Sequence, residues 1–146
     1  MEQKIAQMNH AANLKRMEYE KMNGLFDWGI LGSGDNIMAF ALIQKVLAAI
    51  HTNSSDNYKQ SVLDFQERVK TLRLGYVPGV IRHHFHGSKK NRKYRERWQI
   101  LVNYNYDPVI HITTNKDGLL VPTDKCPKKL LDDIYMYFKE RNEDEI

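Results

Sequence analysis

An amphipathic helix between Tyr58 and Leu72 is the feature that most constrains how this chain folds. Its apolar residues recur at intervals of four, three, four and three, which places them on one face of an α-helix. These residues are Tyr58, Val62, Phe65, Val69 and Leu72. Such a face has to be buried against other apolar elements, and a chain of 146 residues is long enough to supply them. The pattern therefore predicts a globular core built around this helix.

The rest of the sequence predicts an α+β fold that is rich in helix and has about three short strands. Further helices are expected over residues 2–22, 35–51 and 127–141, with another starting at residue 91. Strands are expected over residues 76–85, 109–113 and 119–121, with turns at 105–108 and 115–118. So few strands cannot close a large sheet. We expect either a small α+β domain or strands that complete a sheet supplied elsewhere.

Composition narrows the class of protein further. The single cysteine, Cys126, excludes an internal disulfide and favours a reducing compartment. No apolar run reaches the roughly 18 residues of a membrane span, and the first 15 residues lack the apolar region of a signal peptide. We therefore expect one domain over residues 1–146, with an acidic tail at 142–146 and no membrane span. It would be cytoplasmic, in a host cell if the protein is viral.

Positive charge is concentrated between Lys89 and Arg97. This run holds six cationic residues and one glutamate, whereas the formal net charge of the whole chain is only +4. The rest of the chain is therefore close to neutral, and the pI of about 9.1 reflects one local cationic site. A surface that binds nucleic acid usually spreads its charge over a longer stripe. Nucleic acid is therefore the less favoured partner.

Three histidines lie directly before the basic run. Strand alternation places His84 and His86 on one face and His83 on the other, so that His84 and His86 could together ligate a divalent ion. A His-x-His sequence also arises often by chance. A solvated edge strand explains these residues equally well.

The basic run itself suits a diphosphate. Arg92 and Arg95 are three residues apart and Arg97 follows Tyr94 by three, so several guanidinium groups can reach one side of a helix start. The glycine turn before Ser88 would place free backbone amides nearby, forming a phosphate-binding nest. The alternative is a solvated helix face, which is the usual role of a charge run.

Asp35 follows the glycine turn Gly32-Ser33-Gly34 and precedes an apolar helical pattern. Aspartate is a preferred N-cap residue, and a plain cap is the simplest interpretation. The functional alternative is a carboxylate presented from a cleft, where the missing side chains of the glycines leave room for a substrate.

Taken in order, these motifs resemble glycosyltransferases of the GT-A fold. Residues 16–27 followed by Gly32-Ser33-Gly34-Asp35 are similar to the acceptor-side region of that fold, and Ile81-Arg82-His83 is similar to a strand whose histidine completes the metal site. A longer pattern resembles family 2-like glycosyltransferases of bacteria, phages and large DNA viruses. It is met by His83, His86, Gly87, Arg92, Tyr94 and Arg97. The resemblance extends over residues 15–141.

The resemblance implies a role for each of these positions. Asp35 would be the catalytic carboxylate on the acceptor side. His83 and His86, with His84 as the alternative, would bind Mn²⁺ or Mg²⁺. The diphosphate would be bound by Lys89, Arg92, Tyr94 and Arg97. The substrates would be a nucleotide sugar and a glycan or protein acceptor.

One departure from the family pattern limits this expectation. The chain has no Asp-x-Asp motif and too few residues before position 15 for a Rossmann-like nucleotide-binding half. We therefore expect the acceptor-side half of a transferase, weak or inactive in isolation, with a possible partner chain supplying the other half. The alternatives are a small basic module that binds nucleic acid or another polyanion, and an inactive remnant that serves as a scaffold.

Overall fold

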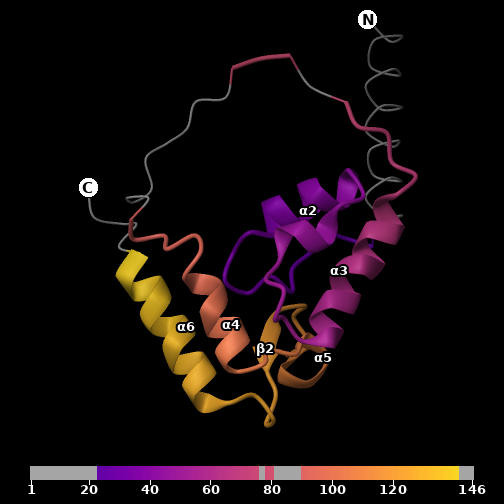
Figure 1. Ribbon diagram of the computed structural model, residues 1–146. Helices are drawn as coiled ribbons and strands as arrows, with labels where there is room; N and C mark the ends of the chain where they lie inside the picture. The colour runs from indigo at the N-terminus through magenta and orange to yellow at the C-terminus, as the bar shows by residue number, and fades with distance from the viewer. Residues whose placement is uncertain (1–22, 76–77, 81–89, 142–146) are drawn as a thin grey trace, which may run out of the picture. The chain divides into compact units, whose positions relative to one another are not determined.

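The computed structural model describes residues 23–75, 78–80 and 90–141 (Figure 1). Within these residues the protein is rich in helix and has one small antiparallel sheet, as expected for an α+β protein. The helix predicted over 2–22 lies outside them, as does most of the strand predicted over 76–85; Pro78, Gly79 and Val80 are not in a strand. None of the described helices is long and apolar enough to cross a membrane.

The described chain forms two compact units. The first contains residues 23–49 and 62–74, and the second contains residues 50–61 together with the described residues from 75 onward. The helix α3 (Asp56–Val69) contributes its N-terminal part to the second unit and its C-terminal part to the first. The organisation as a single domain stays a prediction.

The amphipathic helix predicted from residue 58 is confirmed as α3. Tyr58, Val62, Phe65 and Val69 are each no more than 1% exposed. The helix ends at Val69, and Leu72 follows in a turn in which its N–H donates to the Val69 carbonyl over 3.0 Å. The regular apolar spacing therefore identified the buried face correctly, but the helix ends three residues before Leu72.

In the first unit, α2 (Gly34–Leu42) packs against the 3₁₀ helix η1 (Val46–Ala49), and the Val46 N–H of η1 donates to Gln66 Oε1 in the C-terminal part of α3. Phe26 meets the ring of Phe65 edge-on at 5.6 Å. The other buried apolar residues of this unit include Leu31, Ile37, Ala41 and Val46. The single helix predicted over residues 35–51 is therefore wrong, because the chain breaks between α2 and η1.

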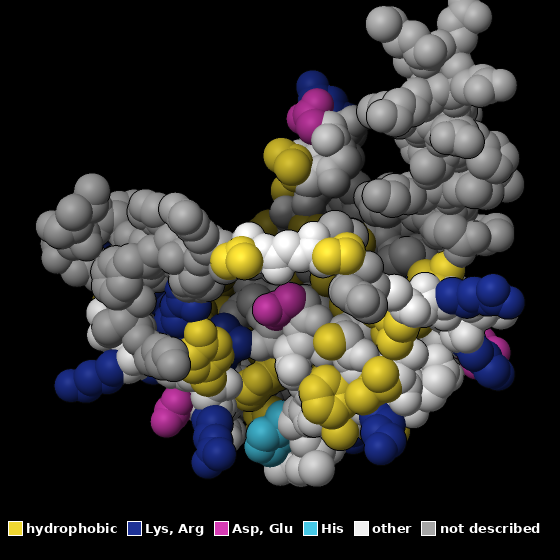
Figure 2. Space-filling model, turned by 90° about the horizontal axis from the view of Figure 1, so that it is seen from above, with side chains coloured by type: hydrophobic (Ala, Val, Ile, Leu, Met, Phe, Trp, Pro, Cys, Tyr) yellow, Lys and Arg dark blue, Asp and Glu magenta, His cyan; other side chains and the backbone are white. Residues whose placement is uncertain are grey.

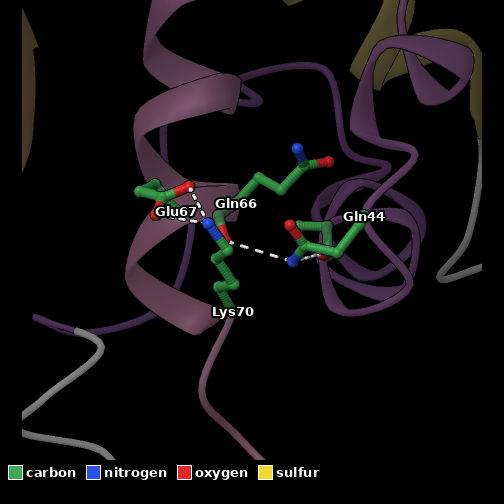
Figure 3. A network of polar contacts seen from close by, with 5 residues as sticks. Gln44, Gln66, Glu67 and Lys70 are labelled. Atoms are coloured by element: carbon green, nitrogen blue, oxygen red, sulfur yellow. Dashed lines mark hydrogen bonds and ion pairs between the residues drawn. The ribbon is translucent and has the colours of Figure 1, made fainter.

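The break occurs at Gln44, whose φ of 59° is left-handed. The Lys45 N–H donates to the Phe40 carbonyl over 2.8 Å and the Gln44 N–H to the Ala41 carbonyl over 3.0 Å, which is a Schellman helix end. Gln66 of α3 holds this end in place: its carbonyl accepts from Gln44 Nε2 and its Oε1 accepts from the Val46 N–H. Figure 3 shows Gln44 beside Gln66, near the Glu67–Lys70 ion pair.

The second unit contains the remaining elements. They are α4 (Arg97–Asn103), α5 (Pro108–His111), β1 (Ile112–Thr114), β2 (Leu120–Pro122) and α6 (Lys128–Arg141). The strands β1 and β2 pair antiparallel around the turn predicted at Asn115–Gly118. The strand predicted to begin at Val109 begins instead at Ile112, because Asp107 and Pro108 start a short helix there.

The final helix is confirmed as α6, and it lies alongside α4 (Figure 1). Leu130 is fully buried, as predicted, and Ile134 is half-buried. The predicted burial of Phe138 is wrong: Phe138 is 44% exposed and Tyr137 is 3% exposed. At 3.6 residues per turn, a residue seven positions after Leu130 returns closer to the same face than one eight positions after it.

Candidate functional site

Asp35 is presented by a tight turn at the start of α2. The Gly32 N–H donates to the Gly29 carbonyl over 2.9 Å, and Gly32 has a φ of 84°, which favours glycine. A Cβ on Gly34 would lie 3.2 Å from the Phe26 carbonyl oxygen, so the helix start approaches the backbone closely there. The turn therefore fixes the direction in which α2 begins.

Asp35 is not the N-cap that the sequence predicted. The N-cap is Ser33, in the left-handed region at φ 68°, and its carbonyl accepts from the Ile37 N–H over 2.9 Å. Asp35 lies in the first turn, where its Oδ1 accepts from the neighbouring Asn36 N–H over 2.8 Å. Its side chain is exposed and forms no ion pair with a described residue. The carboxylate is thus accessible to a ligand.

Three of the residues predicted to bind a diphosphate lie together in the second unit. Arg92 Nη1 donates to the Tyr94 hydroxyl over 2.8 Å, and the guanidinium carbon of Arg97 lies 5.1 Å from the centre of the Tyr94 ring. The Tyr137 hydroxyl, from α6, accepts from Arg97 Nη1 over 3.3 Å and donates to the Arg92 carbonyl over 3.0 Å. Arg92, Tyr94, Arg97 and Tyr137 therefore form one cluster, which we call the arginine–tyrosine cluster.

The members of this cluster differ in how accessible they are. Arg97 is only 8% exposed, whereas Tyr94 is 47% exposed and Arg92 is half-buried. Burying a guanidinium is costly unless it is hydrogen-bonded, and here Arg97 is placed between two tyrosines. Arg97 therefore holds the cluster together, while Arg92 and Tyr94 form its accessible part.

The helix predicted to start at Asn91 starts at Arg97 instead, after turns over residues 90–96. Lys93 has a φ of 42°, which ends any continuous helix through this segment. The phosphate-binding nest predicted at Gly87 and Ser88 lies outside the described residues.

An open groove of about 270 Å³ lies between α4 and α6, beside the arginine–tyrosine cluster. Its lining carries both signs of charge, and Lys93 forms an ion pair there with Glu140. Asp133 at the groove accepts a hydrogen bond of 2.8 Å from the Tyr104 hydroxyl, and this bond raises the pKa of Tyr104. The mixed charge suits a polar ligand better than an extended polyanion.

Four of the predicted site residues lie outside the described residues: His83, His84, His86 and Lys89. Within residues 23–75, 78–80 and 90–141, no group of three or more His, Cys, Asp or Glu side chains is arranged to hold a metal ion. Asp35 belongs to the first unit, whereas the arginine–tyrosine cluster belongs to the second.

A polar cluster around the buried Asp107 was missed by the sequence prediction. The Asp107 carboxylate caps α5 by accepting from the Val109 N–H over 2.9 Å, and it also accepts from Asn57 Nδ2 over 2.6 Å. The Asp107 N–H donates to His111 Nδ1 over 3.2 Å, and Asp107 is 8% exposed. The signal was present, because an Asp-Pro pair is typical of a helix start with proline in its first position.

The chain was compared with protein-family models, curated proteins and solved structures, and none of them matches it.

Proposed function

We propose that this chain is the acceptor-side part of a glycosyltransferase with the GT-A fold, which transfers a sugar from a nucleotide diphosphate sugar to a glycan or protein acceptor. The observation that carries the proposal is the exposed Asp35 carboxylate, which a glycine-rich turn presents and no described residue pairs with. The sequence motifs, taken in order, resemble those of this class of enzyme and support the proposal as well.

In an inverting reaction, the acceptor hydroxyl oxygen forms a bond to the anomeric carbon of the sugar. Asp35 takes the proton of that hydroxyl as general base. The bond between the anomeric carbon and the diphosphate oxygen breaks, and the nucleoside diphosphate leaves with the electron pair. Asp35 suits this role because its exposed carboxylate can approach a bound hydroxyl.

The departing diphosphate gains negative charge, which cationic groups would stabilise. We assign this contact to Lys89 and to Arg92, whose Nη1 donates to the Tyr94 hydroxyl. Arg97 is buried under Tyr94 and acts as a positioning residue. His83 and His86, or His84 in place of one of them, would hold Mn²⁺ or Mg²⁺. The bound ion would supply further positive charge to the diphosphate.

The described charges favour this function over a polyanion-binding module. Within the described part of the basic run, Lys93 is paired with Glu140, while Arg92 and Arg97 are engaged with tyrosines. The side chains of Lys90 and Arg95 form no hydrogen bond or ion pair with other described residues. Lys93 and the buried Arg97 are thus committed within the protein, which shortens the cationic stretch that a long nucleic acid could contact.

A thermal-shift experiment on the full chain tests the proposal. We expect a nucleoside diphosphate sugar to raise the Tm only when Mn²⁺ is present, because the diphosphate and the metal bind together. His83→Ala should abolish this rise, and His51→Ala is the matched control from the described chain. A rise with any oligonucleotide, lost at high salt, would support the polyanion module instead. No response to either ligand would support the scaffold remnant.

Activity gives a second test. The isolated chain should transfer or hydrolyse little sugar, since the nucleotide-binding half is expected on a partner chain. Robust transfer by the isolated chain with Mn²⁺ would contradict the need for a partner. Asp35→Asn should abolish transfer in the complete enzyme while leaving the Mn²⁺-dependent thermal shift unchanged.

A further inference from the structure

The helix α6 carries apolar residues on two sides, and only one of them is buried. Leu130, Ile134 and Tyr137 face the core of the second unit. Leu131, Tyr135 and Phe138 follow at intervals of four and three, which places them on a second stripe of the same helix. Their exposed fractions are 37%, 66% and 44%.

Hydrophobic side chains reach the surface elsewhere as well, as the face in Figure 2 shows. Single exposed apolar residues are common and need no explanation. The stripe on α6, which we call the outer stripe, differs because its three residues are contiguous along one helix and two are aromatic. A continuous apolar stripe of this kind is typical of a helix that packs against another helix.

Two opposite charges flank the outer stripe. Asp132 and Lys139 are seven residues apart, which is about two helical turns, so they lie on the same side of it. Both are exposed, and neither forms an ion pair with a described residue. Each of these two charges is therefore available to a charged group on whatever covers the stripe.

We propose that the outer stripe of α6 binds the same stripe of a second copy of this chain, with the two helices antiparallel. In that arrangement, centred near Tyr135, Asp132 faces Lys139 of the second copy, and the two-fold symmetry repeats the contact. In a parallel two-fold pair, these charges of the two copies lie on opposite sides of the interface and do not meet. The order of charges along α6 therefore favours a second copy of this chain as the partner, and it favours the antiparallel direction for the two helices.

The dimer is expected to be weak. A helix of 14 residues is about 21 Å long. A stripe of that length and about 10 Å wide covers roughly 200 Å², well below the approximately 800 Å² per partner of a standard stable interface. The association should therefore depend on concentration, and it does not rest on the proposed transferase function.

Sedimentation equilibrium on the full chain, from about 10 µM to about 1 mM, measures the association. We expect the weight-average mass to rise from one chain toward two. Tyr135→Ser should weaken the association by roughly tenfold or more, because an aromatic contact is lost from both copies. Tyr135 is 66% exposed, so the variant should keep the wild-type unfolding midpoint in dilute solution.

Charge exchange tests the antiparallel direction. Asp132→Lys and Lys139→Asp should each weaken the dimer, because each brings like charges together at two symmetric contacts. The double variant carrying both substitutions should restore it. Association that ignores Tyr135→Ser, or a double variant weaker than both single variants, would overturn the proposal.

Two other results would also overturn it. A protein that stays monomeric over the whole concentration range has no such dimer. A dilute Tyr135→Ser variant with a lowered free energy of unfolding would mean that the outer stripe packs against another part of the same chain.

Discussion

Two aspartates occupy the starts of two helices, and the protein uses them in opposite ways. Asp107 caps α5 while it is 8% exposed, with its carboxylate bound to both the Val109 N–H and Asn57 Nδ2. Asp35 lies in the first turn of α2 and is exposed, and among the described residues it accepts only from the adjacent Asn36 N–H. One carboxylate is committed to the fold, and the other is accessible to a ligand.

The comparison shows why residue type and position alone do not identify a site. Both aspartates have the preference for helix starts that their chemistry predicts. The difference comes from a residue far away in sequence, because Asn57 belongs to α3 and approaches Asp107 only in the folded unit. A carboxylate without such a partner is the better candidate for chemistry. The following predictions test this distinction.

Asp107→Ala should have the largest effect on stability. The substitution removes an N-cap and the hydrogen bond that the buried Asp107 carboxylate accepts from Asn57 Nδ2, so we expect a loss of about 2–4 kcal/mol in the free energy of unfolding. Urea denaturation measures this loss. Asp124→Ala, at an exposed position, is the matched control and should change little. A loss below about 0.5 kcal/mol for Asp107→Ala would remove the contrast between the two aspartates.

Asn57→Ala should cost less, about 1.5–2 kcal/mol, because the Asp107 carboxylate keeps its bond to the Val109 N–H. The better helix propensity of alanine offsets part of the loss. Asn53→Ala makes the same substitution at another exposed asparagine and serves as the control. A double-mutant cycle with Asp107→Ala should give a coupling free energy of about 1 kcal/mol or more. Full additivity would show that the contact contributes nothing.

The buried Tyr58 should make the stability of the protein depend on pH. It packs edge-on against Tyr106 at 5.7 Å, and burial raises the pKa of Tyr58 well above its ordinary value of 10.0. Above pH 10 the unfolded chain therefore loses this proton while the folded protein keeps it, so stability falls as the pH rises. The loss attributable to Tyr58 is about 1.4 kcal/mol at one pH unit above 10.

Urea midpoints between pH 8 and pH 11 measure this effect, with Tyr58→Phe as the comparison. The variant should lose less stability than the wild type above pH 10, because it has no phenol to ionise at this position. Parallel curves for the two proteins would contradict the buried position of the Tyr58 hydroxyl.

Asp35→Asn should have the smallest effect on stability. The exposed side chain has no ion pair among the described residues, so we expect a change of no more than about 0.5 kcal/mol in the free energy of unfolding. Thermal and urea denaturation both measure it. A loss comparable to that of Asp107→Ala would assign Asp35 a structural role and weaken its proposed role as a base.

Much of the secondary structure could be predicted from local patterns. The apolar spacing of α3 and α6 identified both helices, and the turn at Asn115–Gly118 identified the hairpin. The candidate site was less predictable. Arg92, Tyr94 and Arg97 do lie together, but the contact of Tyr137 with two of them could not be predicted from local sequence, since it comes from α6. The burial of Arg97 depends on that same long-range contact.

Two helix ends separate what the sequence determined from what the tertiary structure decided. Asn105, with φ 44°, ends α4 by the same pair of backbone hydrogen bonds with which Gln44 ends α2. Asparagine tolerates the left-handed conformation, so the sequence alone predicted the turn at Asn105. Glutamine has no such preference, and Gln44 adopts this conformation where Gln66 of α3 accepts from both its side chain and the Val46 N–H. Local stereochemistry determined the first end, and a contact between residues distant in sequence decided the second.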